Sequence, residues 1–392
     1  MIFRFLLIAV LLVILLLVVV PFVLYFAGVN IFPSNTAPIS VRQKTGVVVP
    51  QKLGILMRSQ DRGSSWQNAA ISENPAVSFP SLIYSFVSHP QNPDIMYLGG
   101  AQSGLWKSMN GGRTWDKVID ADHLLDLTAD VHAIEIARAN TDVIYVAAYE
   151  RNHGRILRSD DSGAHFREVY ATSADKKGVF DIVVDGSNVD HVFAVTYEGA
   201  LIETTNGGKT WRVKKLFTKP LVRLIANPDN IRELYLVDGG GEVFKSVTGG
   251  SDWSDPIGKT SQNNGVVEQY PPTIFNFFGS NSSAAQIVFM LDPLNASRVY
   301  LGSGKTLLRS EDAGFTWKEV NLLFSKDLLP VTAMAIDPHT SSAIYVAAAQ
   351  ELQKSTDDGA TWSDIPLPAG ISIKKLIIHP RDSNIMFAVV GR

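Results

Sequence analysis

The sequence predicts an all-β fold: a seven-bladed β-propeller of four-stranded antiparallel blades, closed where N- and C-terminal strands share one blade. Three observations lead to this prediction. A short motif occurs seven times, strand-like runs recur between its copies, and the two ends of the repeat region complete each other. Copies spaced by about 40 to 50 residues are typical of propeller blades rather than of helical solenoids. We place the propeller at residues 49–392.

The repeated motif is Ser-x-Asp-x-Gly-x-x-Trp, which we call the box. All seven copies keep the glycine, and six of the seven tryptophans fill the last position. Asp or Asn can bond its own backbone and glycine accepts a positive φ, so each box predicts a hairpin turn. The leading Ser and the Asp should accept hydrogen bonds from turn amides, and the final aromatic should pack on a neighbouring sheet. The third and eighth positions are Asp61 and Trp66, Asn110 and Trp115, Asp161 and Phe166, Asn206 and Trp211, Thr248 and Trp253, Asp312 and Trp317, and Asp357 and Trp362.

Two strand-like runs lie upstream of the boxes. The nearer run is rich in β-branched and aromatic residues, as at 143–148 and 344–348. The farther run is apolar and ends in Asp-Pro or His-Pro, as at 288–293 and 376–380. With the box between a third and a fourth strand, each unit supplies the four strands of one blade.

The two ends of the repeat region supply the halves of one blade. Residues 375–392 match the first two strands of a unit and stop before any box, whereas residues 54–66 match a third strand and its box. We therefore expect a composite blade that closes the ring and removes two exposed strand edges.

Composition argues against several classes of function. The net charge is −3 and no basic cluster interleaved with aromatics occurs, so we expect no nucleic-acid partner. The chain has no cysteine, which excludes disulfides and thiolate chemistry. The eight histidines show no metal-ligand spacing. We expect neither a metal nor a cofactor.

Residues 1–26 differ from the rest of the chain. From Phe5 to Phe26 there is no charge, and about 22 apolar residues suffice for a helix across a hydrocarbon core of roughly 30 Å. We predict an N-terminal transmembrane anchor, with Arg4 keeping the N-terminus cytoplasmic and the propeller extracytoplasmic: periplasmic, luminal or at the cell surface. A cleaved signal peptide is the alternative, although its apolar region is usually only about 7 to 15 residues long. Residues 27–48 predict an extended tether.

The boxes resemble a known repeat. Ser108 to Trp115 and Ser310 to Trp317 look like the Asp-box, or BNR repeat, of sialidases, xyloglucan-cleaving double propellers, sortilin-type receptors and propeller-type photosystem II assembly and stability factors. With one box per blade and a single ring, the chain is most similar to the assembly-factor group. The resemblance covers roughly residues 49–392. It implies the fold strongly and the function weakly, because the box recurs on proteins with unrelated activities.

An enzymatic reading has less support from individual residues. Sialidase-like proteins carry an Arg-Ile-Pro element ahead of the first box, and no such string occurs here. Hydrolysis by paired carboxylates needs two acids facing each other at roughly 5 to 10 Å. Asp292 and Asp337 are candidates, but their position in Asp-Pro turns gives them a structural explanation. The sequence leans away from catalysis without excluding it.

Binding is expected on the face opposite the boxes. Strands alternate in direction, so the loops after second strands and the connections between blades share that face. Aromatic and arginine side chains at a concave rim are common anchors of a partner. The candidates are Tyr149, Arg151, His153, Tyr197 and Lys305, each with the alternative of an ordinary solvated loop residue.

One interval is longer than the others. Trp253 and Trp317 are about 64 residues apart, against 40 to 50 elsewhere, and the excess carries Phe275, Phe277 and Phe278. An insertion with exposed aromatics suggests a docking element. The alternative is that the insertion folds back over the central channel.

These observations define two hypotheses about function. The first is a membrane-anchored extracytoplasmic propeller that binds a protein partner, itself membrane-associated, as a scaffold or as an assembly or stability factor of a membrane complex. The second is a cell-surface glycan-binding protein or glycoside hydrolase. An enzyme needs converging carboxylates or arginines in a deep pocket, whereas a protein binder needs an extended rim with aromatic and basic anchors.

Overall fold

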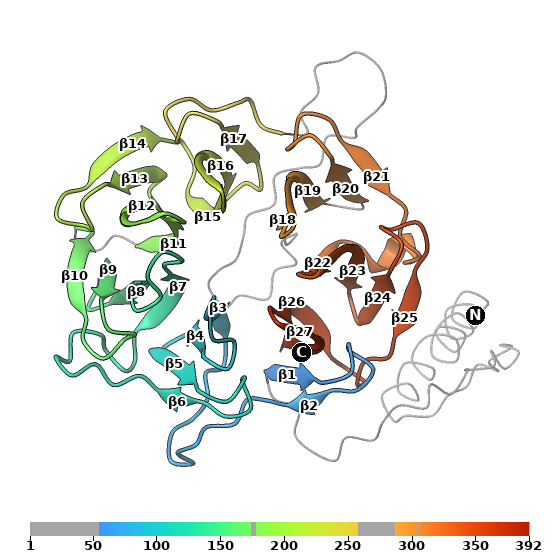
Figure 1. The fold of residues 1–392 in the computed structure, drawn as a ribbon, viewed down its shortest axis with the longest axis horizontal. Coiled ribbons are helices and arrows are strands. Elements are labelled where there is room, and N and C mark those ends of the chain that lie inside the picture. The colour runs from blue at the N-terminus through green and yellow to red at the C-terminus, as the bar shows by residue number, and fades with distance from the viewer. Residues whose placement is uncertain (1–54, 174–177, 258–286, 304–305, 392) are drawn as a thin grey trace, which may run out of the picture. The chain divides into compact units, whose positions relative to one another are not determined.

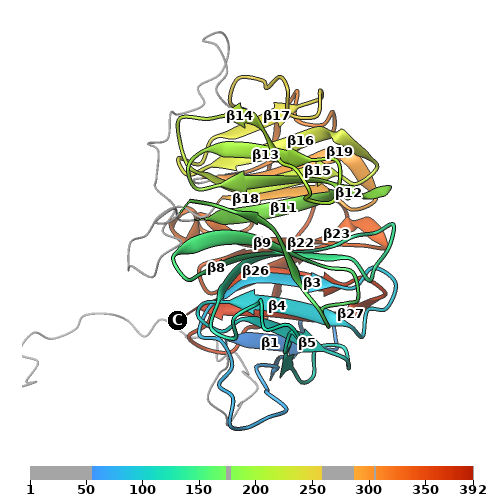
Figure 2. The same ribbon diagram turned by 90° about the vertical axis from the view of Figure 1, so that its left-hand side faces the viewer.

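The computed structural model describes residues 55–173, 178–257, 287–303 and 306–391. These residues form seven antiparallel sheets around a central channel (Figure 1). Figure 2 shows the same sheets from the edge of the ring, stacked on their neighbours. The fold is therefore the all-β seven-bladed propeller that the sequence predicts.

Each blade runs from an inner strand at the channel to an outer strand at the rim (Figure 1). The first two blades contain β3 (Ile83–Ser88), β4 (Met96–Gly100), β5 (Leu105–Ser108) and β6 (Asp116–Lys117), then β7 (Asp130–Ile136), β8 (Ile144–Glu150), β9 (His153–Ser159) and β10 (Arg167–Ala171). The third and fourth contain β11 (Val179–Asp185), β12 (Asn188–Thr196), β13 (Ala200–Thr204) and β14 (Arg212–Leu216), then β15 (Leu221–Asn227), β16 (Asn230–Asp238) and β17 (Val243–Ser246). The fifth and sixth contain β18 (Val288–Asp292), β19 (Asn295–Ser303), β20 (Thr306–Ser310) and β21 (Lys318–Val320), then β22 (Val331–Asp337), β23 (Thr340–Ala348), β24 (Glu351–Ser355) and β25 (Ser363–Ile365). A short 3-10 helix, η2 (Lys326–Leu328), precedes β22.

The seventh blade is the composite blade. Its strand order is β2-β1-β27-β26, with β1 (Leu56–Ser59) and β2 (Gln67–Asn68) from the front and β26 (Ser372–His379) and β27 (Asp382–Gly391) from the end. Met57 of β1 pairs with Ala388 of β27 on one side and with Asn68 of β2 on the other. The two-plus-two junction predicted from the sequence is confirmed.

The fourth blade departs from the expected four strands. Its sheet contains β15, β16 and β17, and beyond the box only an isolated bridge joins Val243 to Ile257. Pro256 lies next to that bridge, and a proline has no amide to donate to a ladder. The fourth blade is therefore three-stranded in the part of the chain that the structure describes.

Apolar clusters fill the seams between blades. Across the described residues seven clusters occur, one for each pair of neighbouring sheets around the ring. At the closing seams, Phe387 of β27 packs with Met96 and Trp106 of the first blade, and Tyr345 of β23 packs with Leu376 of β26. Because no seam lacks its cluster, the ring is closed by packing as well as by strand pairing.

Each box forms a hairpin turn with one hydrogen-bond pattern. The Ser or Thr hydroxyl accepts from the glycine amide at distances from 2.7 to 3.0 Å in all seven boxes. The third-position side chain accepts from the seventh-position amide over the same range. The seven glycines have φ between 71° and 93°, a region that side chains beyond glycine rarely adopt. Trp66, Trp115 and Phe166 are buried, and Trp211, Trp253, Trp317 and Trp362 are half-buried.

The predicted N-terminal anchor at residues 1–26 and the tether at residues 27–48 lie outside the described residues. Within the described part of the chain, no helix is long and apolar enough to cross a membrane.

Candidate functional site

The two faces of the ring carry different loops. On one face, which we call the box face, the fourth-position amide of a box donates to the carbonyl at the start of the second strand, as from Gly111 to Asp94 (2.9 Å) and from Gly207 to Asp190 (2.9 Å). Boxes and first-to-second-strand turns therefore lie together. The opposite face, which we call the loop face, carries the second-to-third-strand turns and the connections between blades.

Three of the predicted binding residues lie on one hairpin of the loop face. Tyr149 lies at the end of β8, Arg151 in the turn and His153 at the start of β9. Arg151 and Asn152 both have a positive φ, 51° and 65°, which is the geometry of a two-residue hairpin turn that follows the strand twist. Arg151 is exposed, whereas Tyr149 and His153 are half-buried. The hairpin therefore presents a cation at its tip with aromatic rings beneath it.

The same hairpin abuts the third blade. A Cβ atom on Gly154 would lie 2.1 Å from the Cα atom of Gly178, so the two backbones meet with no room for a side chain. The amide of Tyr197 donates to the carbonyl of Gly178 (3.0 Å). Tyr197 is thereby brought to the same seam as Tyr149, Arg151 and His153.

Four rings continue from this seam along the inner strands, and we call them the aromatic arc: Tyr84, His132, Phe180 and Tyr197. Tyr84 stacks on His132 with centroids 5.2 Å apart and planes at 23°. His132 contacts Phe180 at 4.9 Å, and Phe180 contacts Tyr197 at 5.7 Å. Tyr84, His132 and Phe180 lie near the starts of β3, β7 and β11, which are the loop-face ends of three neighbouring inner strands. Contacts of this kind stabilise a rigid row of rings, of which His132 and Phe180 are buried and Tyr84 and Tyr197 half-buried.

His132 is the polar member of the arc. It is buried, and its Nδ1 atom forms no hydrogen bond among the described residues. Burial lowers the pKa of His132 to about 4, so the ring is neutral at physiological pH. A neutral imidazole adds a hydrogen-bonding atom to the arc without adding charge.

A buried ion pair fixes the loop beside the hairpin. The Arg155 guanidinium pairs with the Glu150 carboxylate, and both residues are buried. The other Glu150 oxygen accepts from the amide of Asp126 (2.8 Å), and Arg155 donates to the carbonyl of Leu124 (2.9 Å). The bonds to Asp126 and Leu124 hold the connection between β6 and β7 against the β8–β9 hairpin. Loss of either Glu150 or Arg155 would leave the other charge buried without its partner, which is costly.

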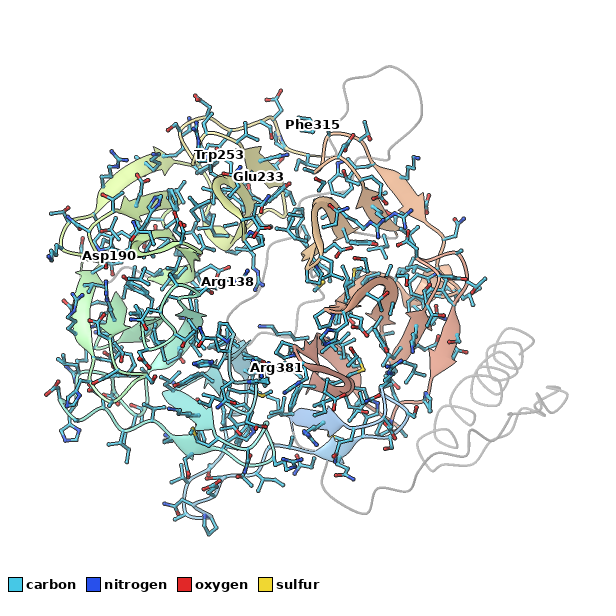
Figure 3. All side chains as sticks on the ribbon, viewed as in Figure 1. Arg138, Asp190, Glu233, Trp253, Phe315 and Arg381 are labelled. Carbon is cyan, nitrogen blue, oxygen red and sulfur yellow. The ribbon has the colours of Figure 1, made fainter. Side chains whose placement is uncertain are left out.

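The inner strands also bring charged residues together. Glu135 lies on β7, Asp181 on β11, Arg223 on β15 and Lys375 on β26. Asp181 accepts from the amide of Leu224 (3.0 Å) and lies 3.6 Å from the Arg223 guanidinium. Arg138, just beyond β7, lies at the inner edge of the ring (Figure 3).

These charged groups shift one another's pKa values, although they come from separate blades. Burial raises the pKa of Glu135 to about 8, and the Asp181 carboxylate adds to the rise while Arg138 and Arg223 oppose it. Burial lowers the pKa of Lys375 to about 8, with the Arg223 charge acting in the same direction and Asp181 against it. Both groups therefore exchange protons near neutral pH, and each can donate or accept a hydrogen bond.

The structure brings some of the predicted binding residues together and leaves others undescribed. Tyr149, Arg151, His153 and Tyr197 meet at the seam between the second and third blades. Lys305 and the insertion residues Phe275, Phe277 and Phe278 lie outside the described residues. The sequence analysis missed Tyr84, His132 and Phe180. When the inner strands are aligned on His89, Ala137 and Asp185, an aromatic ring falls at one shared position in three consecutive blades, and that alignment is the signal that would have found them.

The two acids considered for catalysis have structural partners. Asp292 is buried and accepts from the amide of Leu294 (2.9 Å) and the hydroxyl of Ser341 (2.8 Å). Asp337 accepts from the amide of His339 (2.9 Å) and the hydroxyl of Ser383 (2.7 Å). Both carboxylates fasten turns of the box face to the next blade.

Comparison with known sequences gives distant relatives. No protein-family model matches the chain. A xyloglucanase of Paenibacillus sp is 24% identical over 314 residues, covering 65% of this chain and 30% of that protein. The xyloglucanase Xgh74A of Acetivibrio thermocellus is 28% identical over 137 residues, covering 30% of this chain and 16% of that protein. The chain thus spans less than a third of the length of these curated relatives.

Comparison with solved structures defines the class of protein. YCF48 bound to D1 peptide superposes with a TM-score of 0.57 at 16% identity, covering 79% of this chain and 92% of that one. YCF48 from Cyanidioschyzon merolae gives 0.58 at 14% identity, covering 79% and 95%. The GH74 xyloglucanase of Xanthomonas campestris gives 0.61 at 15% identity, covering 83% and 52%. The chain is a seven-bladed propeller similar in fold to YCF48 and to the propellers of GH74 xyloglucanases, and at these identities the likeness establishes the fold alone.

Proposed function

We propose that this protein is a membrane-anchored extracytoplasmic propeller that binds a protein partner on its loop face and acts as a scaffold or assembly factor. The observation that carries the proposal is the aromatic arc with the β8–β9 hairpin beside it. Rigid aromatic rings next to an exposed arginine are the residue types enriched where proteins bind one another.

The shape of this surface favours a peptide segment of the partner over a compact ligand. The arc crosses three blades, from Tyr84 on the first to Tyr197 on the third. An extended segment can reach from the half-buried ring of Tyr84 to that of Tyr197, with the exposed Arg151 available to an acidic side chain at one end. YCF48, whose propeller is similar in fold to this one, has been solved with a bound D1 peptide.

Residues 1–26 complete the proposal as the anchor. The 22 uncharged residues from Phe5 to Phe26 would hold the propeller at a membrane, with residues 27–48 as a tether. Extraction of membranes at alkaline pH tests this part separately: an anchored chain stays with the membrane, and a chain released into the supernatant contradicts the anchor. Whether protease added to intact cells cleaves the propeller tests on which side of the membrane the propeller lies.

Site-directed photo-crosslinking in cells tests the binding face. A photoreactive residue in place of Arg151 should link to a discrete membrane protein, and adding Tyr84→Ala should remove that link. The control is the same residue in place of Lys209, which is exposed on the box face of the third blade. Equal crosslinking from both positions, or a link that survives Tyr84→Ala, would contradict the proposal.

A second candidate function is glycan binding or hydrolysis. It is favoured by the sequence match to xyloglucanases and by the pair of acids Glu135 and Asp181, of which the first has a pKa suited to a general acid near neutral pH. Release of reducing sugars from xyloglucan by the purified protein, abolished by Glu135→Gln, would support hydrolysis over scaffolding.

A further inference from the structure

A cation precedes the box in six of the seven blades, and in most it fastens one blade to the next. It lies above the aromatic ring of its own second strand, as Arg58 does over Phe387 (5.8 Å) and Lys245 over Tyr235 (5.5 Å). It also donates to the fourth-position carbonyl of the next box: Arg58 to Gly111 (3.2 Å), Lys245 to Ala313 (2.8 Å) and Arg309 to Asp358 (2.8 Å). Arg158 instead bonds Asp190 and the hydroxyl of Tyr145.

Lys354 of the sixth blade also directly precedes a box, but it lacks the acceptor in the next blade that Arg58, Lys245 and Arg309 have. Its ammonium lies over the ring of Tyr345 at 5.3 Å, as the pattern requires. Within the described part of the chain, however, it forms no ion pair and no side-chain hydrogen bond. The next box is that of the composite blade, whose fourth residue is a second cation, Arg62. A half-buried ammonium beside another cation is unfavourable unless an anion accompanies them.

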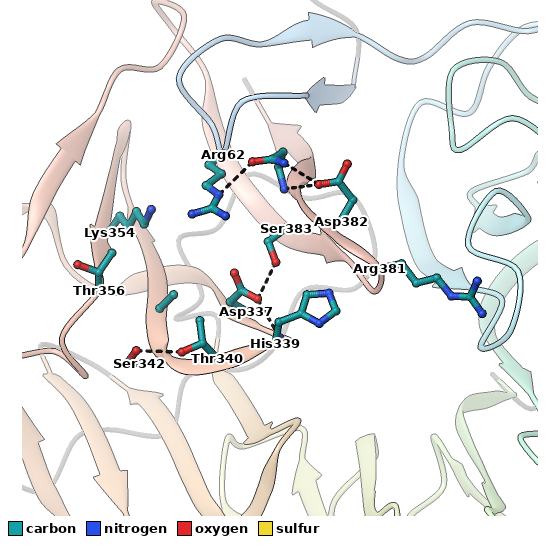
Figure 4. Close-up of a pocket in the computed structure, with 12 residues that line it drawn as sticks. Arg62, Asp337, His339, Thr340, Ser342, Lys354, Thr356, Arg381, Asp382 and Ser383 are labelled. Atoms are coloured by element: carbon teal, nitrogen blue, oxygen red, sulfur yellow. Dashed lines mark hydrogen bonds between the residues drawn. The ribbon is translucent and has the colours of Figure 1, made fainter.

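The two cations face a cavity of about 490 Å³ on the box face, between the sixth and the composite blades. Figure 4 shows the Lys354 side chain extending toward Arg62, and both residues line this cavity. The hydroxyls of Thr340, Ser342 and Thr356 line it as well. The volume lies within the roughly 300 to 1,000 Å³ of small-molecule sites and exceeds what a bare ion fills.

The carboxylates of the cavity are engaged elsewhere. Asp337 accepts from the hydroxyl of Ser383 (2.7 Å) and the amide of His339 (2.9 Å). Asp382 accepts from both the amide (2.9 Å) and the side-chain nitrogen (2.8 Å) of Asn384. Neither forms an ion pair with Lys354 or Arg62 among the described residues.

The third cation on the lining is directed away. Arg381 donates to the carbonyl of Gln91 in the first blade, and Figure 4 shows its side chain on the far side of the turn. Arg62 donates from Nε to the Asn384 side-chain oxygen (3.1 Å), and its terminal nitrogens form no hydrogen bond with the residues that the structure describes.

The mutual effect of the cations agrees with this arrangement. Burial lowers the pKa of Lys354, the positive charge of Arg62 lowers it further, and Asp337 opposes both. A ligand anion between the two cations would remove this cost.

We propose that this cavity binds a hydroxylated small molecule with one oxyanion group, such as a carboxylate or a phosphate. The oxyanion lies between Lys354 and Arg62, and the hydroxyl groups of the ligand meet Thr340, Ser342 and Thr356. Guanidinium and ammonium groups are the usual partners of such anions in proteins. The site is on the face opposite the aromatic arc, so it is independent of the protein-binding surface.

A second cavity provides a matched control. It measures about 300 Å³ and lies at the seam between the first and second blades, where Lys107 occupies the position equivalent to Lys354. This cavity is lined by a second cation, Lys117, but also by the three carboxylates of Glu73, Asp116 and Asp161. The carboxylates outnumber the two ammonium groups, so this cavity should not attract an anion.

The test is isothermal titration of the full chain in detergent with glucuronate, glucose 6-phosphate, inorganic phosphate and glucose at constant ionic strength. We expect both anionic sugars to bind at least about tenfold more tightly than either inorganic phosphate or glucose, because each of those lacks one half of the recognised chemistry. Lys354→Gln and Arg62→Gln should each weaken binding of the anionic sugars about tenfold or more, and Lys107→Gln should leave it unchanged.

Three outcomes would overturn the proposal. Absence of binding by both anionic sugars would show that the cavity is not a ligand site. Binding that persists in Lys354→Gln and in Arg62→Gln would place any site elsewhere. Equal affinity for inorganic phosphate would remove the role of the hydroxyl side chains. Because Arg62 is exposed and loses only the Asn384 contact, its variant keeps the test valid should Lys354→Gln fold poorly.

Discussion

At the scale of single residues, the box shows how one hydroxyl organises a turn. Ser355 is buried, accepts from the amides of Gly359 (2.8 Å) and Asp357 (3.3 Å), and donates to the Asp357 carboxylate (2.8 Å). No strand ladder reaches these amides, so the hydroxyl replaces backbone pairing. The third blade carries Thr204 in the same role, accepting from Gly208 at 3.0 Å, which shows that the hydroxyl rather than the serine is required.

Ser355→Ala should therefore destabilise the protein, whereas Ser355→Thr should be tolerated. The alanine variant leaves the half-buried amide of Gly359 without its acceptor and removes one of the donors to the Asp357 carboxylate, a loss of about 1 to 3 kcal/mol. Urea unfolding followed by tryptophan fluorescence measures it. If both variants lost the same stability, packing around the serine rather than its hydrogen bonds would be the cause.

His132 predicts a pH dependence at the same scale. Its pKa in the folded protein is about 4 and that of an unfolded histidine is about 6.5, so the unfolded state binds the proton more readily. The stability contribution is fully present above pH 6.5 and is lost as the pH falls from there toward 4, by up to about 3 kcal/mol.

Replacing His132 by Phe keeps the stacked ring and removes the titration. The variant should lose less stability than the parent between pH 6.5 and 4, as measured by urea unfolding at a series of pH values. The box acids do not interfere with this window, because the pKa values of Asp161, Asp312 and Asp357 are lowered to about 2 by hydrogen bonds and their effect belongs to pH below 4. Identical pH profiles for parent and variant would show that the arc does not hold His132 neutral.

At the scale of elements, the seam between the second and third blades contains the closest approach of two backbones near the candidate site. The β8–β9 hairpin meets the start of β11 at Gly154 and Gly178, and the neighbouring atoms are backbone atoms that cannot move aside alone. This seam brings the β8–β9 hairpin next to Gly178, whose carbonyl accepts from the amide of Tyr197.

Gly154→Ala should push the hairpin away from β11 and cost about 1 to 3 kcal/mol, as overpacking of a filled space does. The matched control is Gly239→Ala, where the added Cβ would lie 3.5 Å from its nearest neighbours, an ordinary contact. Thermal unfolding compares the two. A Gly154→Ala variant as stable as the Gly239→Ala variant would show that the blades separate without cost.

The elements were largely predictable from the sequence, and the candidate site was only partly so. Box spacing and the Asp-Pro turns set the strand order, because turn chemistry is local and written in a few residues. The fourth blade was mispredicted as four-stranded because its box suggested an outer strand that Pro256 does not support. The aromatic arc escaped notice because Tyr84, His132 and Phe180 are far apart in the sequence and meet only when three inner strands lie side by side. The Lys354 cavity escaped for the same reason, since Lys354 and Arg62 belong to opposite ends of the chain.

At the scale of the whole molecule, closure of the ring joins the most distant parts of the sequence. Arg62 and Asn384 are 322 residues apart and yet hydrogen bonded, and Phe387 is fully buried against the first blade. Loop closure over so long a separation costs entropy that strand pairing must offset. The closing seam should therefore form after the blades whose contacts are local.

Phe387→Ala and Phe193→Ala separate the closing seam from an ordinary one. Both rings are buried on second strands, at the closing seam and between the third and fourth blades, so each loss should cost about 3 to 5 kcal/mol at equilibrium. The kinetics should differ. If closure follows the folding transition state, Phe387→Ala accelerates unfolding and leaves the refolding rate nearly unchanged, whereas Phe193→Ala slows refolding. Stopped-flow fluorescence over a range of urea concentrations measures both rates. Refolding slowed equally by the two variants would show that the ends of the ring meet early, and that the composite blade guides folding rather than completing it.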